Sequence, residues 1–248
     1  IGGAGQDVAV YSANPRPLTV ELSDASVSTI IDGYGDTDII VDVEGIVGSI
    51  WDDRLTGSNG ANLLMGGDGS DILIGNGGND TLNGGAGFDT IDYGLEHSGT
   101  SGVVVRITNP GMGTVDDRSG ATDTFTAIER LVLTDVDDKV VNAMFGTRFD
   151  GGGGTDTIAF DSHTNALIID RRGSDPTLFD IYDDGLLRHV IHISGFERLE
   201  VSGAAVVTLL PNTSRATGSE IINPGMSIDY SDVRQAAHFR LAYPDEST

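Results

Sequence analysis

The sequence predicts an all-β fold, a right-handed parallel β-roll or β-helix solenoid whose coils are interrupted by longer strand-loop excursions. Three observations support this prediction. Residues 66–92 read as three consecutive nonapeptides, GGDGSDILI, GNGGNDTLN and GGAGFDTID, and a fixed period of nine is typical of a solenoid. The acidic residues are mostly Asp, 30 against 8 Glu, as expected of short oxygen ligands. A longer unit, a nonapeptide followed by an aromatic residue and a strand, recurs three times.

Each column of the nonapeptide has a physical role. Small residues at the first, second and fourth positions permit a tight turn, because Gly adopts positive φ and lets backbones approach closely. The sixth position is always Asp and the eighth always aliphatic: Asp71, Asp80 and Asp89, then Leu73, Leu82 and Ile91. Stacked coils place these carboxylates in a row, where they repel one another unless a cation lies between them. Oxygen-only ligands favour a hard ion such as calcium.

The columns GGxGxDxUx resemble the RTX (repeats-in-toxin, haemolysin-type calcium-binding) nonapeptide. The resemblance implies a parallel β-roll with several Ca²⁺ ions bound in the turns. Two nonapeptides make one turn of the roll, and each ion is held between coils n and n+2 on the same side. The implied oxygen donors, besides the Asp residues, are Gly66, Gly67, Asp68, Gly69, Gly75, Gly77, Gly78, Asn79, Gly84, Gly85, Gly87, Gly151, Gly152 and Gly154.

The recurring unit predicts three modules in a solenoid over residues 1–210. They cover roughly residues 2–56, with extra coils over 57–83, then 84–150 and 151–210. Their nonapeptides are followed by predicted strands at Leu18–Leu22, Val103–Ile107 and Ala166–Asp170. Thr37–Asp53 also aligns without gaps on Thr122–Asp138, and we expect the excursions Asn109–Gly120 and Gly173–Gly185 to be surface loops.

Nine-residue spacing predicts which Asp residues share an ion. The first series is Asp53, Asn62, Asp71, Asp80 and Asp89, and the second is Asp138, Thr147 and Asp156. In the family's geometry, residues eighteen apart lie on the same side. We therefore expect the ion shared by Asp71 and Asp89 to be among the most tightly bound. The ion that Asp80 shares with the neutral Asn62 should be the weaker of the two.

Four Asp residues are less well determined by spacing. Asp53 is a doubtful ligand, because its coil, GSIWDDRLT, lacks Gly at the second and fourth positions. Asp7, Asp38 and Asp123 are candidate ligands that pair across the excursions, but spacing alone leaves their register open.

Residues 211–248 interrupt the pattern. We expect either a cap with a short helix at Ser231–Leu241 or a linker. The first residues, Ile-Gly-Gly, fall within a motif, so we expect a section of a longer protein.

Composition excludes several classes of function. A net charge of −24 argues against nucleic acid and anionic membranes as partners. The sequence contains no run of 18 apolar residues, so we expect no membrane insertion. It also contains no Cys, so disulfides cannot stabilise the chain outside the cell, and bound metal is the natural alternative. The sequence contains no HExxH zinc motif and no G-x-S-x-G nucleophile elbow.

Two functional hypotheses follow. The first is a non-catalytic calcium-binding module of a type I secreted Gram-negative bacterial protein, which folds on extracellular Ca²⁺. The second is a calcium-stabilised adhesin, S-layer or carbohydrate-binding surface, with extracellular polysaccharide or a cell surface as partner. A third, weaker interpretation is an accessory region of a secreted epimerase, lyase, lipase or protease whose catalytic part lies outside these residues.

Overall fold

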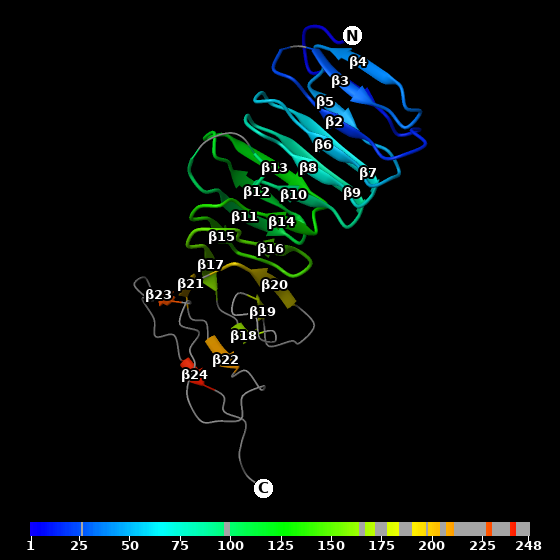
Figure 1. Cartoon of the computed structure of the whole chain (residues 1–248). Coiled ribbons are helices and arrows are strands. Elements are labelled where there is room, and N and C mark those ends of the chain that lie inside the picture. The colour runs from blue at the N-terminus through cyan, green and yellow to red at the C-terminus, as the bar shows by residue number, and fades with distance from the viewer. Residues whose placement is uncertain are drawn as a thin grey trace.

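The computed structural model describes a stack of strands that runs from the N-terminal coil downward in Figure 1. It describes residues 1–25, 27–96, 100–163, 167–171, 178–183, 190–196, 198–203, 207–210, 227–229 and 239–241, and the side chains of 1–25, 27–96, 100–160 and 191–196. Every regular element within these ranges is a β-strand. A membrane-spanning helix is absent from the described ranges.

The strands form two sheets, and their spatial order differs from their order in sequence. Sheet 1 contains, in spatial order, β1 (Val8–Val10), β5 (Gly45–Val47), β7 (Leu63–Gly69), β9 (Thr81–Gly87), β13 (Thr122–Thr126), β12 (Met112–Asp116), β11 (Val104–Asn109), β15 (Lys139–Val141), β17 (Thr157–His163), β21 (Arg198–Gly203) and β23 (Ser227–Asp229). Sheet 2 contains β24 (Phe239–Leu241), β22 (Val207–Leu210), β18 (Leu167–Arg171), β19 (Leu178–Asp183), β20 (Val190–Ser194), β16 (Arg148–Asp150), β14 (Arg130–Val132), β10 (Thr90–Asp92), β8 (Ile72–Ile74), β6 (Arg54–Thr56), β2 (Thr19–Glu21), β3 (Val27–Ile31) and β4 (Thr37–Val41).

The nonapeptide coils alternate between the two sheets, so that eighteen residues complete one turn. Leu64 in β7 pairs in parallel with Leu82 in β9, and Leu73 in β8 pairs in parallel with Ile91 in β10. All four side chains are fully buried. The predicted β-roll and its column of inward-facing aliphatic residues are therefore confirmed.

Three antiparallel meanders interrupt the parallel coils: β2–β4, β11–β13 and β18–β20. In each meander the first strand pairs in parallel with a later coil strand, as β11 does with β15. The last strand of the second meander, β13, pairs in parallel with the earlier β9, and β20 pairs in the same way with β16. The predicted strands at the start of the excursions are thus present as β2, β11 and β18.

The prediction that Asn109–Gly120 and Gly173–Gly185 are surface loops is wrong where these ranges are described, because β12 and β19 lie within them. The turn residues Pro110 and Gly111 suggested a loop, but the residues that follow alternate between the two faces of the sheet. Gly113 and Val115 are buried, whereas Met112 and Thr114 lie on the more exposed face. Pairing on both sides of β12 makes this weak alternation sufficient for a strand.

The predicted internal repeat is visible in the element boundaries. The starts of β4, β5 and β6, at residues 37, 45 and 54, each lie 85 residues before those of β13, β14 and β15. Asp42 and Ala127, again 85 apart, both have positive φ, at 52° and 54°. The two copies occupy opposite sheets, since β4 belongs to sheet 2 and β13 to sheet 1.

The C-terminal region contributes only short described strands. The last three residues of the predicted helix form β24 instead, and residues 231–238 lie outside the described residues. The prediction of a cap or linker for 211–248 therefore stays a prediction.

Candidate metal sites

The sixth residue of each nonapeptide lies at a corner of the roll, directly before a strand. Asp53, Asp71 and Asp89 precede β6, β8 and β10 at the corner that leads into sheet 2. Asn62 and Asp80 precede β7 and β9 at the corner that leads into sheet 1. Two separate rows result, because successive nonapeptides enter opposite sheets.

Hydrogen bonds connect the carboxylates of the sheet 2 corner in one direction. The backbone N–H of Asp53 donates to Oδ1 of Asp71 at 2.7 Å, and that of Asp71 donates to Oδ1 of Asp89 at 2.8 Å. The N–H of Asp89 donates to Oε2 of Glu129 at 2.8 Å. Each carboxylate therefore holds the preceding turn of its row, which lies eighteen residues earlier for Asp71 and Asp89, as predicted.

The same pattern occurs at the sheet 1 corner. Asn62 donates its backbone N–H to Oδ1 of Asp80 at 2.8 Å, and Asp80 donates to Oδ1 of Asp123 at 2.9 Å. Farther along, Asp138 donates to Oδ1 of Asp156 at 2.8 Å. Asp123 thus follows Asp80 in the row, a register that spacing alone left open.

Asp80 consequently has an acidic neighbour as well as the neutral Asn62. The expectation of a weaker ion at Asp80 considered only Asn62, because sequence spacing does not reveal that β13 returns to pair with β9.

The other two residues of open register occupy the N-terminal end. The backbone N–H of Asp7 donates to Oε2 of Glu44 at 3.0 Å, and Oδ2 of Asp7 accepts the N–H of Gly3 at 2.7 Å. Asp38 accepts the hydroxyl of Tyr11 at 3.3 Å. Asp7 therefore belongs to a row, whereas Asp38 contacts a tyrosine.

The second carboxylate oxygen distinguishes the central coils. Oδ2 of Asp71, Asp80 and Asp89 is buried and accepts no hydrogen bond from the described residues. In each case this oxygen faces the first Gly of its own turn; a Cβ on Gly84, for example, would lie 2.6 Å from Oδ2 of Asp89. A buried anionic oxygen without a donor is costly, so these atoms fit a bound cation.

The electrostatics of the ion-free chain lead to the same conclusion. Burial is the main cause that raises the pKa of Asp71 to about 7 and that of Asp80 to about 8, and the neighbouring carboxylates Asp89 and Asp123 respectively raise them further. Burial likewise raises the pKa of Asp89, and it raises that of Asp123 to about 6. The coils are thus poorly suited to hold several negative charges without a compensating positive charge.

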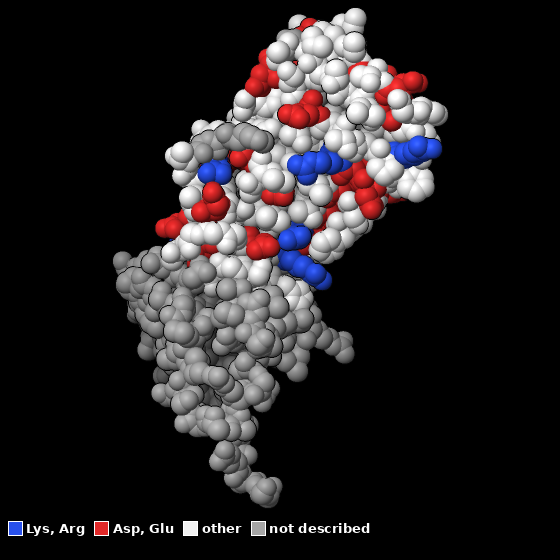
Figure 2. All heavy atoms as spheres, viewed as in Figure 1, with Lys and Arg blue, Asp and Glu red and all other residues white. Residues whose placement is uncertain are grey.

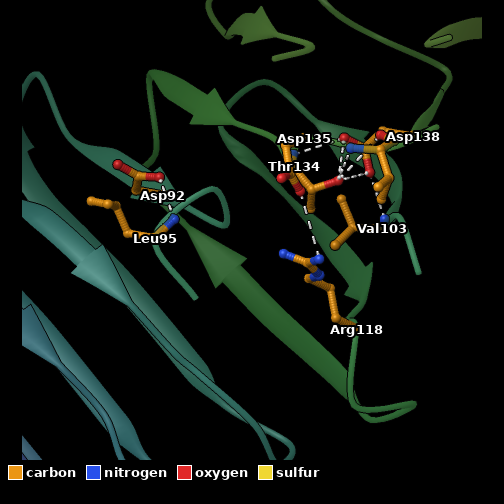
Figure 3. A network of polar contacts seen from close by, with 8 residues as sticks. Asp92, Leu95, Val103, Arg118, Thr134, Asp135 and Asp138 are labelled. Carbon is orange, nitrogen blue, oxygen red and sulfur yellow. Dashed lines mark hydrogen bonds and ion pairs between the residues drawn. The ribbon is translucent and has the colours of Figure 1, made fainter. Parts of the chain in front are cut away.

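Asp53 and Asp138 differ from Asp71, Asp80 and Asp89, because both of their carboxylate oxygens accept hydrogen bonds. In Figure 3, Asp138 accepts the N–H of Val103 on Oδ1 at 2.6 Å and the N–H of Thr134 on Oδ2 at 2.7 Å. Asp53 accepts the N–H of Leu18 on Oδ1 at 2.7 Å and that of Ser49 on Oδ2 at 2.5 Å. These two carboxylates hold their own turn and the strand that opens a meander, and they are weaker candidates as ligands than Asp71 and Asp89.

The turn glycines bring backbone oxygens from successive coils close together. Gly67 has φ of 115°, and a Cβ there would overlap the carbonyl oxygen of Ser49. A Cβ on Gly85, with φ of 110°, would overlap the carbonyl oxygen of Gly67 in turn. Carbonyl oxygens therefore lie between stacked turns, where a calcium ion could use them.

The remaining predicted site residues lie in these turns with different surroundings. Asp68 is exposed, and the side chain of Asn79 accepts the N–H of Thr122 at 2.9 Å. In the third module, a Cβ on Gly151 would lie 2.5 Å from Oδ2 of Asp156. The other turn glycines of the prediction, Gly66, Gly69, Gly75, Gly77, Gly78, Gly87, Gly152 and Gly154, lie in the same stacked turns.

Sequence reasoning missed two kinds of residue in the rows. Glu44 and Glu129 occupy positions in the rows that Asp occupies in the nonapeptides. The alignment of Thr37–Asp53 on Thr122–Asp138 already showed that the two segments share this Glu. Asp52 and Asp137, the first members of the two Asp-Asp pairs, accept the N–H of Ser70 and Thr155 at 2.7 and 2.8 Å. The repetition of Asp-Asp was the signal for this second contact between turns.

The donor set is oxygen throughout. Across the described ranges, no three His, Asp or Glu side chains converge on one point, so an ion would need backbone carbonyls as well as carboxylates. Calcium accepts such mixed sets of six to eight oxygens. Figure 2 shows acidic side chains over the stacked coils with few basic ones among them, in keeping with the net charge of −24.

Comparison with known families identifies the central coils. Residues 52–91 match the RTX calcium-binding nonapeptide repeat in four copies. The match starts one residue before Asp53 and ends at Ile91, so it includes Asp71, Asp80 and Asp89. A search of curated proteins found no match to this chain.

Proposed function

Residues 52–91 are RTX calcium-binding repeats, and from that premise we propose that this chain is a calcium-dependent folding module of a type I secreted bacterial protein. The observation that carries the proposal is the buried Oδ2 of Asp71, Asp80 and Asp89, which accepts no hydrogen bond from the described residues. These oxygens lie in the turns that connect the two sheets. Neutralising them therefore couples ion binding to the stacking of the coils.

The carboxylates oppose folding when no cation is present. Oδ1 of Asp71 and of Asp89 accepts the backbone N–H of the residue eighteen positions earlier, so stacking of the turns buries the whole carboxylate. Burial without a cation either protonates the carboxyl group or costs desolvation energy. The net charge of −24 adds repulsion along the whole chain.

Calcium, when bound, supplies the positive charge that these turns lack. A site with a dissociation constant of ~10⁻⁴ M stabilises the folded state by about 1.4 kcal/mol at millimolar calcium and by almost nothing at submicromolar calcium. Several such sites together would make folding favourable outside the cell and unfavourable in the cytosol. The chain would then be secreted in an unfolded state and fold into the roll outside the cell.

The proposal assigns no catalytic role to this chain. The Asp carboxylates support neighbouring turns through Oδ1 and face their own turns through Oδ2, so their positions are explained by folding and ion binding. A general acid and a general base in a shared cleft are not needed to account for them.

Circular dichroism of the whole chain tests the proposal. We expect little β structure in excess chelator, its recovery on addition of calcium, and no recovery with equimolar magnesium, because Mg²⁺ requires a small octahedral shell and retains water. A β spectrum that is the same with chelator and with calcium would contradict calcium-dependent folding.

A second candidate function, a binding surface on the roll, is favoured by the outer face of the first meander. Val27, Ile31 and Ile39 are 49%, 64% and 66% exposed there. The equivalent face of the second meander carries the ion pair between Arg106 and Asp116. If the apolar face binds polysaccharide or a cell surface, Ile39→Thr in the calcium-loaded chain should weaken that binding without changing the melting temperature in calcium by more than a few degrees. Equal binding by the variant would exclude this face.

A further inference from the structure

Glu96 is a buried carboxylate outside the nonapeptide turns. It follows β10 by four residues, its backbone N–H donates to the carbonyl oxygen of Tyr93 at 3.3 Å, and its side chain is 6% exposed. Neither Oε1 nor Oε2 has a hydrogen-bond partner among the described residues. The ion pairs of the described residues likewise do not include it.

The surroundings of Glu96 are acidic. Tyr93, three residues earlier, donates its hydroxyl to Oδ2 of Asp123 at 3.0 Å, while Oδ1 of Asp123 accepts the N–H of Asp80. Asp123, Asp117 and Asp80 act on Glu96 electrostatically, in that order of strength. Burial and these three carboxylates raise the pKa of Glu96 to about 9, and the nearby backbone N–H of Asn76 acts in the opposite direction, but less.

All three of these neighbouring carboxylates accept hydrogen bonds. Asp117 holds its own hairpin turn by accepting the N–H of Ser119 at 2.9 Å and of Ala121 at 2.7 Å. Asp123 accepts donors on both oxygens and Asp80 on one. The guanidinium of Arg118, the residue after Asp117, points toward Asp135, 3.7 Å away (Figure 3). Glu96 differs from these neighbours because both of its oxygens are buried and form no hydrogen bond among the described residues, although the backbone N–H of Asn76 lies nearby.

The first module shows that the fold does not require an acid at this place. Asn14 follows Tyr11 by three residues, as Glu96 follows Tyr93, and its N–H donates to the carbonyl oxygen of Tyr11 at 2.8 Å. Tyr11 contacts Asp38 just as Tyr93 contacts Asp123. The neutral amide of Asn14 is hydrogen-bonded through both its oxygen and its nitrogen: it accepts the N–H of Gly33 at 3.2 Å and donates to the carbonyl oxygen of Arg16 at 2.9 Å.

Asp123, in β13 of the second meander, continues the row that contains Asn62 and Asp80. The next strand of sheet 1, β12, runs antiparallel to β13 and brings no nonapeptide turn to this corner. Glu96 adds a carboxylate near this end of the row, where Asp123 is its strongest charged neighbour. A carboxylate with two unpartnered, buried oxygens in such a place is accounted for by a cation.

We propose that Glu96 and Asp123 together bind a calcium ion at the junction between the RTX coils and the second meander. The site rests on the proposed calcium-dependent function but lies outside the nonapeptide pattern. Since no third acidic side chain in the described residues converges on this point, backbone carbonyls and water complete the coordination. Both oxygens of Asp123 retain a second lone pair for this purpose.

Native mass spectrometry of the whole chain at saturating calcium tests the assignment. We expect Glu96→Gln, which keeps the size and removes the charge, to bind one calcium ion fewer than the wild type. Glu96→Asn, which copies Asn14, should lose the same ion and fold as the first module does. Glu21→Gln, at an exposed position on β2, is the matched control and should bind as many ions as the wild type.

Equal ion counts for the wild type and both Glu96 variants would overturn the assignment while leaving the RTX sites intact. A wild type that binds no calcium at all would overturn the proposed function together with this site.

A measurement on the wild type alone covers the case in which neither variant folds. With ¹³C-labelled glutamate carboxyls, infrared spectra at neutral pH in calcium should show only ionised glutamate; a protonated glutamate band would show that Glu96 is a neutral acid and would refute the site.

Discussion

The backbone N–H of Asp71 donates a hydrogen bond of 2.8 Å to Oδ1 of Asp89, eighteen residues later in the chain. The two residues directly precede neighbouring strands of sheet 2, and Oδ2 of both remains buried without a hydrogen bond from the described residues. One carboxylate oxygen thus holds the adjacent coil while the other is left for a cation. This division explains how a single Asp column can serve both the stacking of coils and the binding of ions.

The first prediction concerns the number of ions bound. Asp89→Asn and Asp80→Asn should each remove about one ion and lower the midpoint of thermal unfolding in calcium, because each removes a negative charge from a buried site. We expect Asp89→Asn to damage folding most. Titration calorimetry and melting curves in calcium measure both effects. The control is Asp36→Asn, an exposed residue between β3 and β4 and outside the predicted sites; if it loses as much as Asp89→Asn, the ions are held by general surface charge.

The nonapeptide columns were sufficient to predict the roll and its interior, because period and burial coincide there. Leu64, Leu73, Leu82 and Ile91 are fully buried at the predicted eighth positions. The columns were not sufficient to separate Asp53 from Asp71. Their difference depends on Ser49, whose N–H and hydroxyl both contact the carboxylate of Asp53, and one residue of this kind does not alter the nine-residue pattern.

The meanders were only partly predictable for a related reason. The turn residues Pro110 and Gly111 suggested a loop, but a strand paired on both sides, such as β12, needs little intrinsic preference. The position of Asp123 beside Asp80 depends on that reversal of the chain, as does the burial of Glu96. Long-range pairing therefore determines the two features of the site that spacing could not predict.

The second prediction concerns pH in the absence of calcium. Burial raises the pKa of Asp71 to about 7 and of Asp80 to about 8 from an ordinary 3.8, so the folded chain binds more protons than the unfolded chain between these values. Stability of the calcium-free roll should therefore fall as pH rises from about 4 to 8. Calcium affinity should rise over the same window, because the ion competes with protons. Circular dichroism in chelator at pH 5 and pH 8 measures the first effect: the residual β structure should be greater at pH 5, and more β structure at pH 8 would contradict the prediction.

The third prediction concerns the close approach of turns. Gly67→Ala should prevent the turn from stacking on that of Ser49, because the residue has φ of 115° and its new Cβ would overlap the carbonyl oxygen of Ser49. We expect calcium-dependent β structure to be reduced or lost. Gly60→Ala is the matched control, since the nearest atom to its Cβ, Oγ of Ser58, lies 3.6 Å away. Similar circular dichroism for the two variants in calcium would show that turn stacking tolerates a side chain.

The fourth prediction concerns the core. Leu73→Ala should destabilise the calcium-loaded chain by about 2–5 kcal/mol, because Leu73 is fully buried and the rigid coils cannot collapse around the cavity. Ile50→Ala, at a position that is 57% exposed, should change stability far less. Denaturant unfolding in saturating calcium provides the comparison. A loss below about 1 kcal/mol for Leu73→Ala would mean that packing between the sheets contributes little once ions are bound.

The last prediction separates two carboxylates that the sequence treats alike. Asp138 and Asp156 are joined by a hydrogen bond of 2.8 Å from the N–H of Asp138 to Oδ1 of Asp156, but Asp138 also accepts the N–H groups of Val103 and Thr134 on its two oxygens. Asp156→Ala should therefore remove about one ion. Asp138→Ala should keep the ion count and lose stability, at about 1–3 kcal/mol for each buried N–H left without an acceptor. Calorimetric stoichiometry and denaturant unfolding distinguish the two effects. If Asp156→Ala leaves the stoichiometry unchanged, the eighteen-residue pairing does not hold an ion in the third module, and packing alone joins that module to the roll.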